Sequence, residues 1–329
     1  MDVGSDQYLL SCDWGTSSFR LQLIDIPSGR PLAGVQANEG AAIVFDRWKN
    51  QKEVERAAFF MHVLGRHIGE LARQVPFSLA GIPVVISGMA SSSIGIMELP
   101  YAELPFSLDG AQARTYRMDP SRMFPHPVLL VSGVKSETDV MRGEETQLMG
   151  LRRQFRSNAV FLFPGTHSKH IHVQNGFITG FETYMTGEIF HLLTSHSILK
   201  DSVQRPRLDV EPGGEELAAF RKGVNHPWGG NLLHAAFQVR TNDLLGKLDK
   251  GLNFFFLSGL LIGNELRHLK EEGKAAQASE VVLCGGQSFT TFYRQAAEEL
   301  GIRQQLLTVS DEAAGLAASS GHLSLLHLL

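Results

Sequence analysis

Small polar residues around a glycine follow an apolar run near the start of the chain. The stretch Tyr8–Asp25 reads YLLSCDWGTSSFRLQLID, and its turn is the run Gly15-Thr16-Ser17-Ser18. Glycine lets a backbone approach a ligand, and the hydroxyls beside exposed N–H groups can bind a terminal phosphate. Asp13 at the end of the apolar run could hold Mg²⁺ through water. The stretch predicts a phosphate site, although an ordinary polar turn has a similar composition.

A second turn of the same kind occurs in the stretch Ala159–Thr179, AVFLFPGTHSKHIHVQNGFIT. Its glycine, threonine and serine are in step with those of the first turn. The second turn contains Gly165, Thr166, His167, Ser168 and Lys169. A repeated unit of this size indicates two similar halves.

The two turns differ in one position that concerns metal binding. Phe163 stands where Asp13 stands in the first copy. Metal binding should therefore depend on Asp13, while Lys169 could add a point charge on phosphate.

Apolar spacing predicts the elements that position these turns. Apolar residues alternate on both sides of each turn, which is typical of β-hairpins. A helix is expected over Lys49–Gln74 and a buried helix over Leu252–Leu266, whereas Lys200–Asn231 is polar, rich in Gly and Pro, and expected to be a peripheral excursion. Further buried strands, and one helix, are predicted at Pro83–Ile86, Pro127–Ser132, Glu280–Cys284 and about Thr290–Leu300.

Two of these strands lead into polar loops, where ligands of open α/β sheets gather. The loop Ser87–Gly95 contains Met89 and Ser91 and is a candidate binder of sugar hydroxyls, with a flexible Gly/Ser connection as the alternative. The strand Pro127–Ser132 leads to Ser136–Asp139, which has capping-box spacing.

The segment after this capping box is Met141-Arg142-Gly143-Glu144-Glu145. Together with Asp139, its acids and arginine could abstract a proton and bind an anion. Acids that merely complement a helix dipole are the alternative. The chemical interpretation is preferred because the segment lies between the two phosphate turns in sequence.

The second half has two further candidate sites. Thr186 is expected to be a helix N-cap, so Glu188 could either act chemically or only complement the dipole. The run Gly285-Gly286-Gln287 follows the last buried strand, and such a turn lets an adenine ring lie on the backbone.

Composition limits the classes of partner. The chain has 329 residues, 43% of them hydrophobic, and a formal net charge of -4, which favours a globular protein of two domains and argues against nucleic acid or an anionic membrane as partner. Its two cysteines, Cys12 and Cys284, lie in apolar runs and are expected to be reduced. The start has no basic and apolar signal segment, so we expect a cytoplasmic enzyme.

The remaining motifs are negative. His167, His170 and His172 have no acidic or cysteine partner nearby, which argues against a metal site there. The sequence contains no GxxxxGK[ST], GxGxxG or GxSxG motif, so the P-loop, dinucleotide and α/β-hydrolase routes are excluded.

The sequence resembles the 2-dehydro-3-deoxygalactonokinase family of the actin-like sugar kinases. The resemblance rests on Asp13-Trp14-Gly15, Gly88-Met89 with Gly95, Met141–Gln147, Pro164–His167 with Lys169, Met185–Glu188 and Leu257–Gly263. A departure is His170, where the family often has an aromatic residue. The resemblance implies an α/β fold of two actin-like (ribonuclease H-like) domains with an ATP cleft between them. We expect an N-terminal domain over 1–153, a C-terminal domain over 154–311, and a last helix at about 312–329 that packs back on the first.

The implied reaction is ATP- and Mg²⁺-dependent phosphorylation of the 6-hydroxyl of 2-dehydro-3-deoxy-galactonate, a small sugar acid. Phosphates would contact Gly15–Ser18 and Gly165–Lys169, and adenine would contact Gly285–Gln287. Glu144 is the preferred base, with Asp139 and Glu188 as rivals, and Arg142 is the preferred partner of the substrate carboxylate. The other expected substrate contacts are Met89, Ser91, Glu145 and Thr183.

Alternatives remain open at this level. A phosphohydrolase of polyphosphate or of a guanosine phosphate would use a similar site with water as acceptor, but 30 Lys and Arg against 34 Asp and Glu suit a long polyanion poorly. A kinase of another sugar acid and a non-catalytic nucleotide switch are the others. The leucine-rich tail His322–Leu329 could dock on its own chain or on a second subunit of a homodimer.

Overall fold

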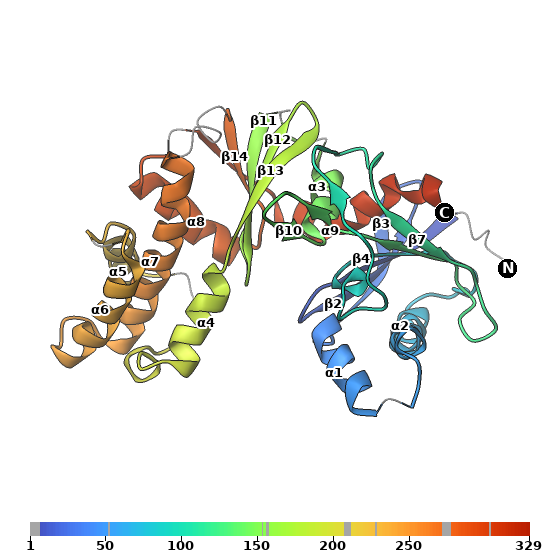
Figure 1. The fold of residues 1–329 in the computed structure, drawn as a ribbon, viewed down its shortest axis with the longest axis horizontal. Coiled ribbons are helices and arrows are strands. Elements are labelled where there is room, and N and C mark those ends of the chain that lie inside the picture. The colour runs from blue at the N-terminus through green and yellow to red at the C-terminus, as the bar shows by residue number, and fades with distance from the viewer. Residues whose placement is uncertain are drawn as a thin grey trace. The chain divides into compact units, whose positions relative to one another are not determined.

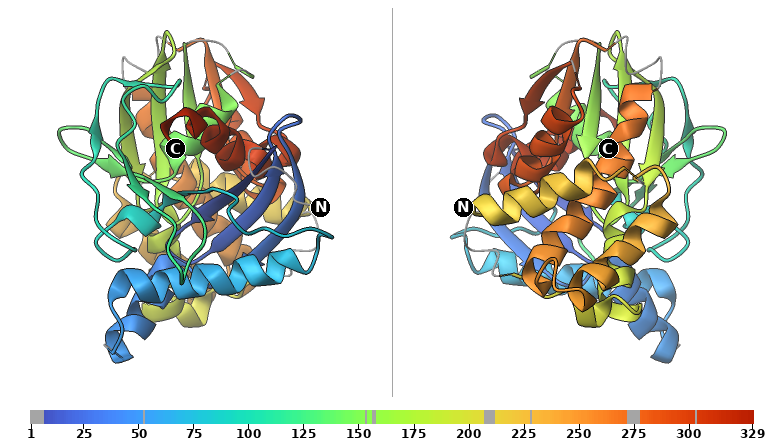
Figure 2. Two further views of the ribbon diagram at one scale, coloured as in Figure 1. Left: turned by 90° about the vertical axis from the view of Figure 1, so that its right-hand side faces the viewer. Right: turned by 90° about the vertical axis from the view of Figure 1, so that its left-hand side faces the viewer.

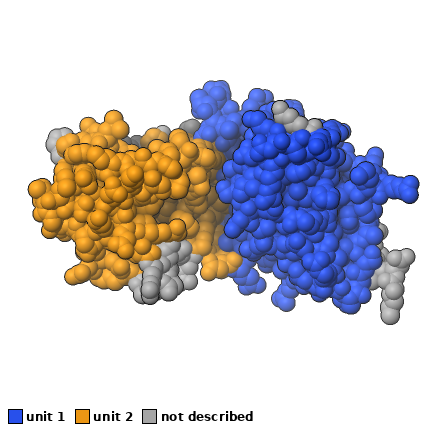
Figure 3. All heavy atoms as spheres, turned by 90° about the horizontal axis from the view of Figure 1, so that it is seen from below, with its two compact units in different colours: residues 1–155, 175–180, 312–329 blue, residues 156–174, 181–311 orange. Residues whose placement is uncertain are grey.

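A computed structural model describes residues 7–51, 53–152, 154–155, 158–206, 212–227, 229–271, 278–302 and 304–329. The chain divides into two compact units (Figure 3). Unit 1 comprises Met1–Phe155, Asn175–Gly180 and Glu312–Leu329, and unit 2 comprises Arg156–Gln174 and Phe181–Asp311. Within the described ranges, no helix is long and apolar enough to cross a membrane.

The first half of the chain builds a six-stranded sheet of order β3-β2-β1-β4-β8-β7 (Figure 1). Its strands and those of a small second sheet are β1 (Tyr8–Trp14), β2 (Phe19–Asp25), β3 (Arg30–Ala37), β4 (Val84–Gly88), β5 (Ala102–Glu103), β6 (Phe106–Ser107), β7 (Thr115–Met118), β8 (Val128–Val131), β9 (Val134–Lys135) and β10 (Val140–Met141). The helices are α1 (Ala41–Gln51), α2 (Arg56–Ala72), the 3₁₀ turn η2 (Met89–Ser91) and α3 (Glu144–Leu151).

The second half builds another six-stranded sheet, of order β15-β14-β11-β12-β13-β6. Its strands are β11 (Asn158–Phe163), β12 (Ser168–Gln174), β13 (Phe177–Tyr184), β14 (Glu280–Leu283) and β15 (Gln305–Thr308). The helices are α4 (Thr186–His196), η3 (Lys200–Ser202), α5 (Gly214–Val224), α6 (Leu232–Leu244), α7 (Lys250–Glu271), α8 (Gln287–Glu299), α9 (Asp311–Ser324) and η5 (Leu326–Leu328).

The two large sheets repeat one topology. The order β3-β2-β1-β4-β8 in the first returns as β13-β12-β11-β14-β15 in the second. In each, the first two strands form an antiparallel hairpin, and the first strand pairs in parallel with a later one, β1 with β4 and β11 with β14. The α/β class with two similar halves of the actin-like kind is therefore confirmed.

Both predicted hairpins are present, and their registers place the turns at the strand ends. Trp14 pairs with Phe19 at the end of the first hairpin, and Phe163 pairs with Lys169 at the end of the second. Strand alternation buries Leu21 and Leu23 and follows the predicted period of two.

Helices cover both faces of the unit 1 sheet (Figures 1 and 2). On one face, Phe60 and Leu64 of α2 pack against Leu10 and Cys12 of β1. Ser11 points to the other face, where its Oγ lies 2.7 Å from Nδ1 of His322 on α9. The leucine-rich tail thus packs on its own chain.

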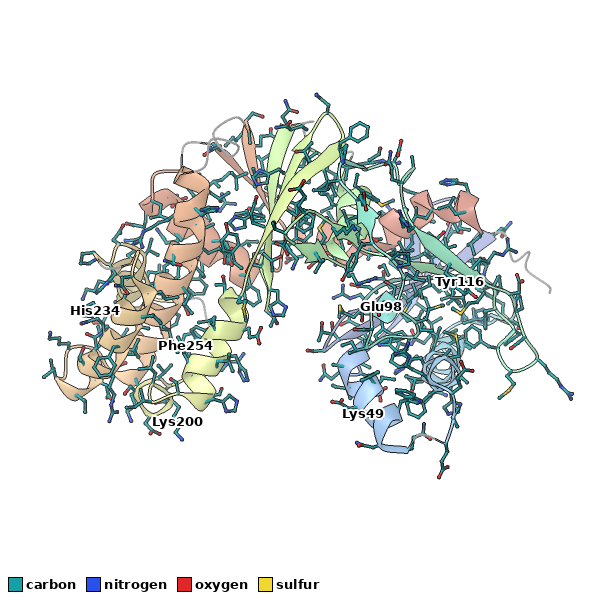
Figure 4. All side chains as sticks on the ribbon, viewed as in Figure 1. Lys49, Glu98, Tyr116, Lys200, His234 and Phe254 are labelled. Atoms are coloured by element: carbon teal, nitrogen blue, oxygen red, sulfur yellow. The ribbon has the colours of Figure 1, made fainter. Side chains whose placement is uncertain are left out.

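Helices α5, α7 and α8 cover one face of the unit 2 sheet, where Val160 and Val281 meet Phe220 and Ala296. The side chains of this layer are drawn in Figure 4, in which Phe254 is labelled. The rings of Phe254 and Phe190 lie 5.0 Å apart, joining α7 to α4.

Two expectations about helices are wrong. The helix expected over Lys49–Gln74 is two helices, α1 and α2, and Val54 between them is exposed. The excursion expected over Lys200–Asn231 contains α5, which packs tightly on α7.

Glycines explain the α5 packing. A Cβ at Gly223 would lie 2.1 Å from the carbonyl oxygen of Phe256, and one at Gly259 would lie 2.0 Å from that of Phe220. Such contacts are open only to glycine, so the small residues that suggested a loop are what lets the two backbones touch.

Candidate functional site

The tip of the first hairpin presents free backbone donors. The Gly15 N–H donates to the carbonyl of Ser18 at 2.9 Å, which closes the turn. Thr16 and Ser17 are exposed, and their N–H groups have no acceptor among the described residues. The N–H groups of Ala41 and Ala42, at the start of α1, donate to the carbonyls of Gly15 and Thr16 and so hold the tip from behind.

The second hairpin repeats this arrangement inside unit 2. The Gly165 N–H donates to Oγ of Ser168 at 3.4 Å, and Thr166 and His167 are exposed. The start of α4 takes the place of α1, because the N–H of Glu188 donates to the carbonyl of Thr166 at 3.0 Å. Both tips therefore offer the donor groups that the sequence predicts for a phosphate site.

A glycine behind each tip makes this contact possible, and the sequence analysis did not identify either one. A Cβ at Gly40 would lie 2.2 Å from the carbonyl oxygen of Thr16, and one at Gly187 would lie 2.5 Å from that of Gly165. The signal available in the sequence was a glycine at each helix start.

Gly187→Ala is expected to destabilise the protein by about 1–3 kcal/mol, because the new methyl group must displace the second tip. It should also weaken nucleotide binding. Thermal unfolding and calorimetric titration with Mg-ATP would measure both effects. Gly315→Ala is the matched control: its Cβ meets nothing within 4 Å in α9, so its stability should be unchanged or higher. Equal behaviour of the two variants would contradict the prediction.

Asp13 stands at the end of β1 beside the glycine that ends β4. Its Oδ2 lies 3.6 Å from Nη1 of Arg20. Burial raises the pKa of Asp13, and the charge of Arg20 opposes this rise. A Cβ on Gly88, which has φ +85°, would lie 3.6 Å from Oδ1 of Asp13, so only a residue without a side chain leaves this carboxylate its room.

The start of α3 meets the same strand end. Gly143 has φ +108°, and a Cβ there would lie 3.4 Å from Cα of Gly88. Glu144 follows directly as the first residue of α3. The ends of β1 and β4 and the start of α3 therefore converge inside unit 1.

Glu145 faces inward and holds this junction. Its carboxylate accepts the Gly143 N–H at 2.8 Å and the Thr146 hydroxyl at 2.9 Å, and the residue is 1% exposed. Burial, and then the charge of Glu144, raise the pKa of Glu145 to about 7. Its inward position does not suit the direct substrate contact expected from the sequence, so its effect on the site would act through Gly143.

The raised pKa of Glu145 predicts a pH-dependent stability. The stabilisation is complete below the ordinary value of 4.5 and is lost as pH rises to about 7, a difference worth about 3 kcal/mol. Urea unfolding at pH 4.5 and pH 7.5 should show this loss in the wild type and a smaller one in Glu145→Gln. Identical losses would assign the pH dependence to other groups, and Glu103→Gln, in an exposed ion pair with Lys135, serves as the control.

The loop after β4 is compact and not a flexible connection. The Ile96 N–H donates to Ala90 at 2.7 Å, and the Leu99 N–H donates to Ser91 at 3.0 Å. Met89 and Ser91 form η2, and Ser91 is fully buried. Its hydroxyl is therefore not free for a sugar as the sequence suggested.

Arg142 is held by this loop. Its Nη1 donates to Oγ of Ser91 at 2.8 Å and its Nη2 to the Leu99 carbonyl at 3.0 Å. The guanidinium also stacks over Tyr101, 4.0 Å from the ring centroid. Two of its three nitrogens are thus engaged, and only the remaining N–H groups are left for an anion.

Asp139 lies elsewhere than expected. Ser136–Asp139 is not a helix cap but the turn between β9 and β10, in which the Asp139 N–H donates to Oγ of Ser136 at 2.9 Å. The helix begins only at Glu144 because the short β10 intervenes. This favours Glu144 over Asp139 at the strand-end junction.

Each histidine of the second hairpin has an acidic partner, contrary to the sequence-based expectation. Nε2 of His167 lies 2.5 Å from Glu188, that of His170 lies 2.9 Å from Glu265, and that of His172 lies 2.7 Å from Glu182. The partners come from distant segments, which sequence proximity cannot reveal. The described residues nevertheless contain no group of three or more His, Cys, Asp or Glu that could hold a metal ion.

The start of α4 also differs from the expectation. Met185 is the N-cap, and Thr186 is the first helical residue, whose hydroxyl donates to Glu265. Glu188 lies in the first turn and belongs to the second hairpin through His167. Thr183 lies in β13.

The remaining nucleotide candidates lie in unit 2. Ser168 and Lys169 are buried in β12, and the Ser168 hydroxyl bonds to Tyr293, so it does not face the solvent. Gly285 and Gly286 precede α8, and a Cβ at Gly285 would contact Pro164 of the second hairpin at 3.6 Å. Gln287 begins α8, but its side chain lies outside the described part of the structure.

Comparison with known proteins was made against families, curated sequences and solved structures. The family model of 2-keto-3-deoxy-galactonokinase matches residues 13–319. The chain belongs to this family. A 2-dehydro-3-deoxygalactonokinase of Escherichia coli K12 is 35% identical over 223 residues, which are 67% of this chain and 71% of the relative.

Two similar proteins cover almost the whole chain. A Rhizobium meliloti protein assigned as the 2-dehydro-3-deoxygalactonokinase DgoK1 is 31% identical over 322 residues, 95% of this chain and 96% of its own. A crystal structure of a Sinorhizobium meliloti protein assigned the same activity has a TM-score of 0.75 at 29% identity, and the match covers 97% and 96% of the two chains.

The 2-keto-3-deoxy-galactonokinase match includes each part of the candidate site. It begins at Asp13 and extends into α9, so it spans both hairpins, the start of α3 and the turn before α8.

Proposed function

We propose that the protein transfers the γ-phosphoryl group of ATP to the 6-hydroxyl of 2-dehydro-3-deoxy-galactonate. Membership of the 2-keto-3-deoxy-galactonokinase family carries this assignment, because the matched span covers residues 13–319. The similar proteins of E. coli and Rhizobium meliloti bear the name of the same activity.

The hairpin tips fit the phosphates of ATP. Phosphate oxygens need N–H and O–H donors, and the exposed Thr16, Ser17, Thr166 and His167 supply such groups without competing acceptors at their backbone N–H. We assign the phosphate contacts to these residues, with Gly15 and Gly165 closing the turns. Gly285 and Gly286 are assigned to the adenine.

Asp13 fits a Mg²⁺ ion that accompanies the nucleotide. A carboxylate is the oxygen ligand that this cation prefers, directly or through water, and bound Mg²⁺ would neutralise charge on the phosphates. The raised pKa of Asp13 makes the cation's charge useful to the protein as well, because a nearby positive charge favours the ionised carboxylate.

Glu144 is assigned as the base that accepts the proton of the attacking hydroxyl. Its charge contributes to the raised pKa of Glu145, so the carboxylate that ionises first at this junction is Glu144. Glu145 then holds Gly143 in place. Phosphoryl transfer depends mostly on positioning, which this junction of two glycines and a buried acid supplies.

The substrate carboxylate is assigned to Arg142. Ser91 and Leu99 fix the guanidinium, and its remaining N–H groups can meet an anion. Met89 at the start of the same loop is assigned to the apolar part of the sugar acid.

The test is ADP release from Mg-ATP with and without 2-dehydro-3-deoxy-galactonate, with the gluconate epimer in parallel. Strong stimulation by the galactonate form alone is expected. Equal stimulation by both would keep the kinase and remove its stereochemistry. Absence of stimulation, with steady phosphate release from polyphosphate, would replace the kinase with a hydrolase.

A further inference from the structure

A buried carboxylate of unit 2, Glu265 on α7, has no assigned part in the reaction above. Glu265 is 3% exposed. Its Oε1 lies 2.9 Å from Nε2 of His170, and its Oε2 accepts the hydroxyls of Tyr293, at 2.8 Å, and Thr186. The partners come from β12, α8 and α4, so one side chain joins three elements.

The carboxylate sets the direction of every bond around it. An ionised carboxylate only accepts, so His170 must donate through Nε2–H, and both hydroxyls must donate. The buried Nδ1 of His170 has no hydrogen-bond partner in the described chain, which suits a neutral ring whose Nδ1 carries no proton.

The same direction continues to the second hairpin. Because the Tyr293 proton points at Glu265, the hydroxyl of Ser168, 3.0 Å from the Tyr293 oxygen, must donate to it. The lone pairs of Ser168 are then left for the Gly165 N–H, which donates to it at 3.4 Å. The chain of donors therefore runs from Gly165 through Ser168 and Tyr293 to Glu265.

This chain decides which N–H groups the tip presents. With the Gly165 N–H turned inward to Ser168, the next two N–H groups, of Thr166 and His167, remain for a ligand. The first hairpin reaches the same result through its backbone alone, where the Gly15 N–H donates to the Ser18 carbonyl. The second hairpin instead uses side chains that end at a buried charge.

The network also reaches the two helix starts beside the tip. Thr186 is the first residue of α4, whose next residue, Gly187, contacts Gly165 and Thr166. Tyr293 lies in α8, the helix that begins directly after Gly286. The tip, the start of α4 and the helix after the adenine turn thus share one anchor.

We propose that Glu265 is a positioning residue for nucleotide binding, which holds the second phosphate turn through Tyr293 and Ser168 and the start of α4 through Thr186. This proposal rests on the proposed ATP-binding function of the second hairpin. A carboxylate that served only to stabilise the core would be a poor choice, because apolar residues of similar volume stabilise a buried site as well or better.

The test measures binding of Mg-ATP by calorimetry for the wild type, Glu265→Gln and Tyr293→Phe, together with kcat and KM. Glu265→Gln keeps the shape but replaces one acceptor by a donor, and Tyr293→Phe removes only the hydroxyl that links Ser168 to the carboxylate. Both should raise the Kd and the KM for ATP about tenfold, as expected for a lost charge-assisted hydrogen bond, while kcat at saturation changes far less.

Asn253→Ala is the matched control on the same helix. Asn253 is fully buried and donates to the carbonyls of Ser202 and Val239, at 3.0 Å each, away from the hairpin. Its loss should lower the Tm and leave the Kd for Mg-ATP unchanged.

Each outcome decides the proposal. Unchanged affinity in Glu265→Gln and Tyr293→Phe would overturn the positioning role while the kinase stands, and so would an equal loss of affinity in Asn253→Ala. A wild type that does not bind Mg-ATP would remove the proposed function together with this inference.

Discussion

Glu144→Gln is expected to lower kcat by about 10²–10⁴-fold, the range for loss of a general base. Glutamine keeps the size of the side chain at the start of α3, so binding should survive and the KM for ATP should stay within about threefold. Steady-state kinetics with the sugar acid would measure the split. The same variant removes the charge that helps to raise the pKa of Glu145, so its pH dependence of stability should also weaken.

Glu103→Gln is the control for this prediction, since Glu103 forms only an exposed ion pair with Lys135 in unit 1. It should keep full turnover. Full turnover in Glu144→Gln would instead transfer the base role to Asp139 or Glu188. Asp139→Asn and Glu188→Gln would then distinguish the turn between β9 and β10 from the second hairpin.

Asp13→Asn is expected to lower turnover by about 10–100-fold, as for a residue that holds a metal ion through water. The KM for the sugar acid should change little, because Asp13 is assigned to the metal and not to the substrate. Turnover measured against Mg²⁺ concentration should shift to higher concentration in the variant. Asparagine leaves Arg20 without its partner at 3.6 Å, so a modest loss of stability is expected as well.

Asp25→Asn provides the matched control, because Asp25 lies at the opposite end of the same hairpin, paired with Tyr8. Its bonds go to the N–H and hydroxyl of Ser28 in an exposed turn. Kinetics and Mg²⁺ dependence should equal those of the wild type. An unchanged Mg²⁺ dependence in Asp13→Asn would remove the metal role from Asp13.

Local patterns in the sequence were sufficient for the features that arise within one element. Both hairpins, the buried strands and the two repeated turns follow from apolar alternation and from glycine beside hydroxyl residues, because strand period and turn chemistry are properties of neighbouring residues. Gly15 and Gly165 lie at turns that close as the sequence predicts. The family was also evident from short motifs spread over nearly the whole chain.

Local patterns failed where a residue's role depends on a distant partner. The capping-box spacing of Ser136–Asp139 belongs to a β-turn, since the pairing of β9 with β10 overrides a local helix signal. The glycines expected to mark loops let α5 approach α7, because their lack of a side chain matters only against the opposing backbone.

The sequence by itself determined the fold class, the two phosphate turns and the family of this protein. Only the tertiary structure decided which polar groups bond to one another: Ser91 with Arg142, Glu145 with Gly143, and His170 with Glu265. Ser91 and Arg142 are 51 positions apart, and His170 and Glu265 are 95 apart. Hydrogen bonds act over about 3 Å in space whatever the separation along the chain, so only the folded chain shows which candidates face a ligand and which hold one another in place.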